Sequence, residues 1–292
     1  MNKSFTLIEI LVVIIVIGIL SAFILVGMSS ITSNANTTKI KVFINSIDNS
    51  LLTSRVSYWS LNGNANDSWG TNNGTLVGPT HLPVLKTGSD CIIESCYEFD
   101  GSEDYISCGN GLNNIYNEDV FSLTMWVYKQ STGTVKALFT NRDVATVGNI
   151  FIFKSATEYL VCDLYDASSI RWTTTYQLPS NIWTSVVFVH NGTNTILYIN
   201  GVQKDSTSSQ STASFPGTST YGTFIGRDSQ SAQYFWQGKI DDVRIYNQAI
   251  STSTIEQNYF LGLSNLCKNE ILSKTEYVQK INQFRNHLVN NE

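Results

Sequence analysis

Apolar and polar positions divide the chain into four stretches. Residues 5–28 are almost entirely apolar, and a helix of this length spans about 36 Å at about 1.5 Å per residue, enough to cross a bilayer. Residues 29–55 begin with a polar run. Apolar side chains then recur at helical spacing, which predicts that the helix continues as an amphipathic segment; they are Ile40, Ile44, Ile47 and Leu51.

The third stretch, residues 56–263, alternates apolar and polar residues in short runs. We expect about twelve to fourteen strands over residues 56–246, because no helical periods separate the runs. Many short strands at close spacing favour an all-β fold, an antiparallel β-sandwich of the jelly-roll type. One run, VFSLTMWVY, places four apolar side chains on one face: Phe121, Leu123, Met125 and Val127.

The fourth stretch, residues 264–292, predicts a short C-terminal helix. Ser273 and Glu276 have the spacing of a capping box at its start. Ser253 and Glu256 have the same spacing and predict a short helix directly after the last strand. The C-terminal helix carries four apolar residues on one face: Tyr277, Ile281, Phe284 and Leu288.

Pairs of turn-forming residues predict two connections and one irregularity. Asn200-Gly201 lies between two strand-like runs and is a strong hairpin signal. Asp100-Gly101 predicts a tight turn. The residues around Asp241-Asp242 can all point inward only if a bulge or a bound ion interrupts the alternation there; they are Ile240, Val243 and Ile245.

Composition and charge exclude some partners. The net charge is −5, so there is no electrostatic basis for binding nucleic acid. His81, His190 and His287 are far apart, and no local spacing indicates a His-based metal site.

The chain has five cysteines, and three of them lie close together in sequence. In an exported protein such a cluster indicates a local disulfide. We expect Cys91 to pair with Cys96, with a Cys96–Cys108 bond as the alternative. Cys162 lies in the strand-like run YLVCDLY and is expected to be a small core residue.

The apolar N-terminal segment has more than one interpretation. A secretory signal that is later removed has a shorter apolar region, preceded by basic residues and followed by a small-residue cleavage site. A plain single-span anchor explains the length of the segment but not Glu9. A carboxylate just inside the hydrocarbon costs about 1–3 kcal/mol and usually marks a partner.

The segment SFTLIE, followed by the long apolar run, resembles the class III signal of type IV pilins and pseudopilins. The resemblance implies that a prepilin peptidase removes the leader, residues 1–4, by cutting between Ser4 and Phe5. Phe5 is then N-methylated, and Glu9 assists assembly with other pilin-like subunits. It also implies a single-pass membrane protein with its N-terminus in the cytoplasm and its globular domain outside. The family usually has Gly where this chain has Ser4, which bears on how readily the peptidase cuts.

Residues 56–260 resemble laminin-G-like, concanavalin A-like jelly rolls. The resemblance rests on segments that occur in the family's order, among them YEFDGSEDYISCG, NIWTSVVFVHNGTNTILYINGV and, the most specific, GKIDDVRIYNQAISTSTIEQNY. It implies two curved antiparallel sheets that bind a glycan or a protein and often hold a structural calcium ion. Hard oxygen ligands for calcium come from loops, and we assign Asp67 and Asp241 as candidates.

Carboxylates and aromatic residues supply the remaining candidates. Glu98, Asp100 and Glu103 spell E-x-D-x-x-E, which resembles the catalytic motif of a glycoside hydrolase family on this fold. Gly101-Ser102 interrupts the motif with a turn, so we expect no enzyme activity and no catalytic residue. Glycan binding requires exposed aromatic rings beside polar groups, and the candidates are Trp172, Tyr176, Tyr234 and Trp236.

These patterns together predict a pilin- or pseudopilin-like subunit of a type IV pilus or a type II secretion-like filament. Its laminin-G-like domain would bind an extracellular glycan or protein in adhesion or recognition. One alternative is a membrane-anchored lectin-like protein that does not assemble. A surface-anchored glycoside hydrolase is the other.

Overall fold

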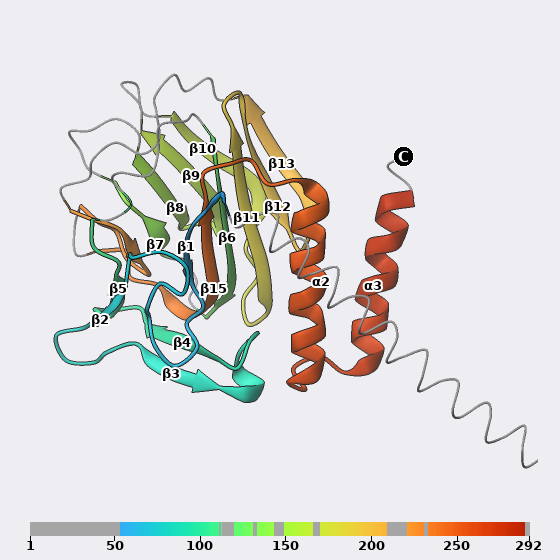
Figure 1. The fold of residues 1–292 in the computed structure, drawn as a ribbon, viewed down its shortest axis with the longest axis horizontal. Coiled ribbons are helices and arrows are strands. Elements are labelled where there is room, and N and C mark those ends of the chain that lie inside the picture. The colour runs from blue at the N-terminus through green and yellow to red at the C-terminus, as the bar shows by residue number, and fades with distance from the viewer. Residues whose placement is uncertain are drawn as a thin grey trace, which may run out of the picture. The chain divides into compact units, whose positions relative to one another are not determined.

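Two antiparallel sheets form a sandwich in the described part of the chain (Figure 1). The structure is a computed structural model, and it describes residues 53–110, 112, 120–130, 133–142, 149–165, 170–208, 221–230 and 233–289. The chain divides between Thr53 and Ser54 into two units, and every described helix and strand belongs to the second. The predicted leader, the membrane-spanning helix and all but the end of the amphipathic segment lie outside the described residues.

Sheet A has eight strands in the described residues, and strands from distant parts of the chain are neighbours in it. Its order is β13 (Val202–Ser208), β12 (Asn194–Ile199), β11 (Trp183–Asn191), β6 (Val120–Lys129), β15 (Gln237–Tyr246), β4 (Ser95–Asp100) and β3 (Val84–Thr87), with β1 (Arg55–Trp59) also paired to β15.

Sheet B has seven strands in the same part of the chain. Its order is β10 (Ile170–Gln177), β9 (Tyr159–Tyr165), β8 (Asn149–Lys154), β7 (Lys136–Thr140), β14 (Phe224–Ile225), β5 (Tyr105–Ser107) and β2 (Thr75–Val77). A short 3₁₀ helix, η1, covers Gly88–Asp90. The all-β antiparallel sandwich predicted from the sequence is confirmed, and the described strands are slightly more numerous than predicted because some, such as β14, are very short.

The turn signals are confirmed in the backbone. Asn200 and Gly201 connect β12 to β13 with φ angles of 52° and 79°, the left-handed pair that a two-residue hairpin needs. Gly101 follows β4 with a φ of 82°. The pairing of β15 with β6 shifts register between Asp241 and Arg244, which is the predicted irregularity.

Apolar side chains from both sheets fill the space between them. The register shift in β15 lets Ile240, Val243 and Ile245 all enter this core, each with 0% exposure. Burial of apolar surface is the dominant favourable term in folding, and the core includes large rings from many strands: Trp59, Phe99, Phe121, Phe139, Phe188 and Trp236.

Two helices follow the last strand and pack on the outer face of sheet A (Figure 1). Helix α2 spans Thr252–Lys268 and helix α3 spans Lys274–Val289. Gly262 of α2 lies against the Trp126 indole so closely that a Cβ atom there would be 2.1 Å from the ring. A glycine therefore allows α2 to lie flat on the sheet.

The helix starts agree with one capping prediction and correct the other. The Glu276 N–H donates to Ser273 Oγ at 3.2 Å, and the Ser273 N–H donates to Glu276 Oε2 at 2.9 Å, so the capping box of α3 is confirmed. The N-cap of α2 is Ser251, which accepts from the Thr254 N–H, and not Ser253. Helix α2 also continues across the predicted domain boundary at residues 263 and 264.

No helix among the described residues is both long and apolar enough to cross a membrane. The apolar segment at residues 5–28 lies outside that part of the chain.

Candidate functional site

The three carboxylates of the E-x-D-x-x-E segment hold the turn after β4 and its neighbours. Glu98 pairs with Lys86 at 2.8 Å and accepts from the Gln130 amide at 2.9 Å. Asp100 Oδ1 accepts from the Ser102 and Glu103 N–H groups at 2.7 and 3.2 Å. Glu103 Oε1 accepts from the Thr80 and His81 N–H groups at 3.0 and 3.1 Å, so each of the three carboxylates has a hydrogen-bond partner in the fold.

The pKa shifts of Glu98, Asp100 and Glu103 all go in the same direction. Retaining and inverting hydrolysis both need one carboxylic acid with a raised pKa. Partial burial raises the pKa of Glu98 and of Asp100, but hydrogen bonds outweigh it and leave both lowered. Hydrogen bonds from Thr80 and His81 lower the pKa of Glu103. None of the three residues is set up as the acid.

A cavity of about 510 Å³ opens beside this turn. Among the carboxyl groups that line the cavity, Asp104 has the largest pKa shift. It is buried, and burial raises its pKa to about 7. Its neighbour Asp100 donates a backbone N–H to Asp104 Oδ1 at 3.0 Å. The lining combines carboxylates and amides with aliphatic groups: His81, Leu82, Val84, Glu98, Phe99, Asp100, Asp104, Gln130 and Gln237.

A cluster of aromatic rings includes Tyr105, the residue that follows Asp104 in the sequence. The Tyr105 and Phe224 rings meet edge to face at 5.5 Å, and the Tyr105 and Phe235 rings lie 6.2 Å apart. The Arg227 guanidinium sits 4.3 Å from the Tyr105 ring centre and 4.7 Å from that of Phe224. We call these four residues the aromatic platform.

The strand register places the aromatic platform on the outer face of sheet B. Ile106 and Ile225 pair across β5 and β14 and enter the core. Because side chains alternate along a strand, Tyr105 and Phe224 point the other way. Tyr105, Arg227 and Phe235 are half-buried, so each keeps part of its side chain at the surface.

The predicted ligand-binding aromatics occupy other places. Trp236 is 0% exposed and belongs to the core, so its assignment as a surface ligand-binding residue was wrong. Trp172 and Tyr176 are half-buried against the same core, and Trp172 meets Phe188 edge to face at 6.1 Å. Tyr234 is 37% exposed and immediately precedes Phe235 of the platform.

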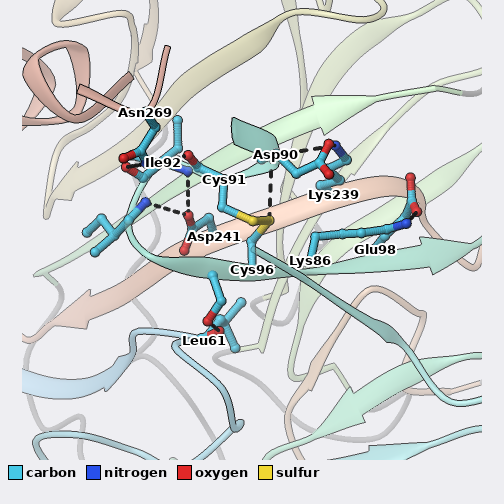
Figure 2. The surroundings of a disulfide bond; sticks show 12 residues. Leu61, Lys86, Asp90, Cys91, Ile92, Cys96, Glu98, Lys239, Asp241 and Asn269 are labelled. Atoms are coloured by element: carbon cyan, nitrogen blue, oxygen red, sulfur yellow. Dashed lines mark hydrogen bonds and ion pairs between the residues drawn. A yellow bond between two sulfur atoms is a disulfide. The ribbon is translucent and has the colours of Figure 1, made fainter. Parts of the chain in front are cut away.

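Asp67 and Asp241, the predicted calcium ligands, both accept hydrogen bonds from backbone N–H groups. Asp67 accepts four, from Tyr58, Trp69, Gly70 and Asn72, at 2.8–3.1 Å. Asp241 is fully buried and accepts from Ile92 and Ile93 at 2.9 and 3.1 Å (Figure 2). Burial raises the pKa of Asp241 well above its usual range.

These surroundings do not fit a calcium site. Calcium prefers several ionised oxygen ligands. The carboxylate oxygens of Asp67 already accept four backbone hydrogen bonds, and burial of Asp241 disfavours its ionised form. Neither belongs to a group of three His, Cys, Asp or Glu ligands among the described residues; the group that does form is His81, Asp100 and Glu103. Calcium binding stays a prediction that the arrangement of Asp67 and Asp241 does not support.

The disulfide joins Cys91 to Cys96, the first of the two predicted pairings (Figure 2). Cys108 has a buried free thiol. Cys162 lies on β9 and is buried in the core between the sheets, as expected. The disulfide loop, residues 91–96, contacts both sheet A and α2. Asn269, at the end of α2, donates its side-chain amide to the Cys91 and Ile92 carbonyls at 3.1 and 3.3 Å.

Comparison with known families accounts for both parts of the chain. Residues 100–256, more than half of the chain, match the family model of the concanavalin A-like lectin/glucanases superfamily. The chain belongs to this superfamily. Residues 1–25 match the prokaryotic N-terminal methylation motif. Both resemblances inferred from the sequence are thereby confirmed.

Solved structures share the superfamily fold at low identity. Domain 4 of AbnA, a GH43 extracellular arabinanase from Geobacillus stearothermophilus solved with arabinotriose, is 21% identical with a TM-score of 0.56, covering 70% of this chain and 97% of that one. The binding domain of Paraclostridial Mosquitocidal Protein 1 is 19% identical with a TM-score of 0.55, covering 73% and 53%. The botulinum neurotoxin serotype D binding domain is 16% identical with a TM-score of 0.56, covering 73% and 52%.

These likenesses concern the fold. The chain spans about half the length of the two toxin domains. No curated protein matches it.

The aromatic platform of this superfamily member was missed from the sequence. Its rings come from three separate segments, around Tyr105, Phe224 and Phe235. The local signal was the run Tyr234-Phe235-Trp236, in which the predicted residue Trp236 enters the core and Tyr234 stays at the surface.

Proposed function

We propose that this protein is a pilin-like subunit, inserted in the membrane by its N-terminal segment, which displays a glycan-binding β-sandwich outside the cell. The match of residues 1–25 to the methylation motif supports the pilin-like part. The superfamily of residues 100–256 supports the lectin-like part.

The aromatic platform is the observation that carries the binding role. Tyr105 and Phe235 are the partly exposed rings of the platform, since Phe224 is buried. Partly exposed rings offer flat apolar surfaces for the apolar face of a sugar, and polar groups beside them fix its orientation. Arg227 is such a group, because its guanidinium lies 4.3 Å from the centre of the Tyr105 ring. Binding fits this geometry better than hydrolysis, because hydrogen bonds hold Glu98, Asp100 and Glu103 in the fold.

Structures with this fold support binding over catalysis. The arabinanase domain was solved with arabinotriose, and others are receptor-binding domains of neurotoxins. We infer that the superfamily domain here serves recognition as well.

A binding experiment tests the proposed site. The full-length protein, solubilised in detergent, is screened on an array of oligosaccharides, and Phe235→Ala is compared with the parent. We expect Phe235→Ala to weaken binding about tenfold or more, because it removes one ring of the platform. Trp69→Ala is the matched control, since Trp69 is an exposed ring, 42% accessible, outside the platform. Glycan binding that is equally sensitive to both changes contradicts this placement.

Assembly rests on Glu9 and the new N-terminus. Cleavage after Ser4 leaves a cationic amine on Phe5, and in a staggered bundle this amine can pair with Glu9 of a neighbouring subunit. Two charges that are each costly in lipid then neutralise one another. Before assembly the cost remains, which favours association.

A Glu9→Ala variant separates a filament subunit from a simple tether. We expect normal membrane insertion but loss of incorporation into filaments. Mass spectrometry of the native N-terminus gives an independent measurement, with a methylated Phe5 as the expected result. Intact Met1 together with absence of the parent protein from filaments is the outcome for an anchored lectin that does not assemble, and unchanged incorporation of Glu9→Ala contradicts the assembly role of Glu9.

A further inference from the structure

Arg227 differs in its polar contacts from three other arginines of the fold, each of which forms an ion pair. Arg142 pairs with Asp228 at 2.6 Å, Arg171 with Asp163 at 2.7 Å and Arg244 with Asp242 at 2.9 Å. Arg227 has no carboxylate partner among the described residues. Its one polar contact there is the bond from Nε to the Asp228 carbonyl at 2.9 Å. Among the described residues, neither terminal nitrogen has a hydrogen-bond partner.

Two aromatic rings of the platform hold the Arg227 guanidinium in place. Tyr105 and Phe224 lie within 4.3 and 4.7 Å of its central carbon, and the Nε bond holds the near end. A cation is attracted to the face of an aromatic ring at these distances. A guanidinium that is already ordered loses little side-chain entropy when it binds a ligand, and its planar fork matches a carboxylate or sulfate.

We propose that Arg227 is an anion-binding subsite and that the ligand is an acidic glycan, one carrying a carboxylate or a sulfate. This inference rests on the proposed glycan-binding function and adds the ligand's charge. The sugar ring lies on the platform, and its anionic group accepts hydrogen bonds from the terminal nitrogens of Arg227.

The cavity beside the turn after β4 is a poor place for the anionic group, because Glu98, Asp100 and Asp104 line it and carboxylic side chains disfavour an anion. The net charge of the protein, −5, provides no general attraction for anions, so a local cation has to supply it.

The experiment compares three sets of oligosaccharides that match in backbone and differ in charge: neutral, carboxylated and sulfated. Binding to the full-length protein in detergent is measured for the parent, Arg227→Gln and Arg227→Lys. We expect Arg227→Gln to weaken the binding of acidic glycans about 10- to 100-fold, the range for a hydrogen bond to a charged group, and to weaken the binding of neutral glycans much less. Arg227→Lys keeps the charge but loses the fork, so intermediate binding is expected. Comparing the carboxylated and sulfated sets identifies which anion is preferred.

The control is Lys204→Gln, which removes an exposed positive charge from β13 and should leave binding of all three sets unchanged. Thermal unfolding of each variant separates loss of a contact from loss of the fold. Equal binding of neutral and acidic glycans with no effect of Arg227→Gln overturns the subsite while the proposed function stands. Failure of every glycan to bind overturns both.

Discussion

The outer faces of the two sheets differ in what covers them. Over sheet A, the chain adds its own cover: α2, α3 and the disulfide loop bury a second apolar cluster against Trp126 and Trp183. Over sheet B, the described residues place no helix, and the face carries the aromatic platform and arginines such as Arg171, whose side chain is 60% exposed. The comparison indicates that one face serves stability and the other recognition.

The covered face depends on few fixed contacts between distant segments. Trp126 stacks on Tyr259 at 5.8 Å, and Trp183 donates its indole N–H to the Asp90 carbonyl beside the disulfide loop at 3.2 Å. Lys239 of β15 forms an ion pair with Asp90, as Figure 2 shows. Changes here should lower stability and leave glycan binding at the platform intact.

Removing the disulfide should have the largest effect on the covered face. A loop of about six residues gives an entropic stabilisation of about 2 kcal/mol, and native disulfides in small domains contribute about 2–5 kcal/mol. We expect Cys91→Ala/Cys96→Ala to lower the free energy of unfolding by about 2–3 kcal/mol, measured by urea denaturation. Binding of glycans at 25 °C should not change.

The free thiol of Cys267 provides the control for this experiment, because it lies on α2 and forms no disulfide. Cys267→Ala should alter stability by less than about 0.5 kcal/mol. If the double variant loses glycan binding while still folded, the two faces are not independent and the comparison fails.

The next effect in size concerns Gly262, where α2 touches the sheet. An added Cβ would lie 2.1 Å from the Trp126 ring, so the helix or the indole must move. Overpacking costs about 1–3 kcal/mol, and the helix regains up to about 1 kcal/mol from replacing glycine with alanine. We expect Gly262→Ala to lose about 1–2 kcal/mol in urea unfolding. Ser264→Ala, at an exposed position of the same helix, should lose nothing, and a Gly262→Ala protein as stable as the parent would show that the cover is not tightly packed.

Local sequence signals predicted much of the fold. Alternation gave the strands, Asn200-Gly201 gave a hairpin, and the spacing of Ser273 and Glu276 gave the start of α3. The disulfide followed from the short separation of Cys91 and Cys96. Each of these depends on residues close together in the chain, which is why one sequence was enough.

The candidate site could not be predicted in the same way. Whether an aromatic residue enters the core or stays at the surface depends on a single step in the backbone. Phe235 and Trp236 are adjacent, yet one belongs to the platform and the other is fully buried. Arg227 also gained its role from three-dimensional neighbours, because Tyr105 is more than a hundred residues away in the sequence.

The smallest predicted effect concerns the capping box of α3, at the edge of the covered face. Glu276 accepts from the Ser273 N–H and hydroxyl at 2.9 and 2.7 Å, and these bonds lower its pKa. Glu276→Ala removes one arm of the capping box, so it should loosen the start of α3 while Phe284 continues to pack on Tyr259 at 6.2 Å. Hydrogen exchange should rise in the first turn of α3 and stay unchanged in β5 and β14. A simultaneous rise around Tyr105 would mean that the helices on sheet A and the platform on sheet B unfold together, and that stability and recognition are not divided between the two faces.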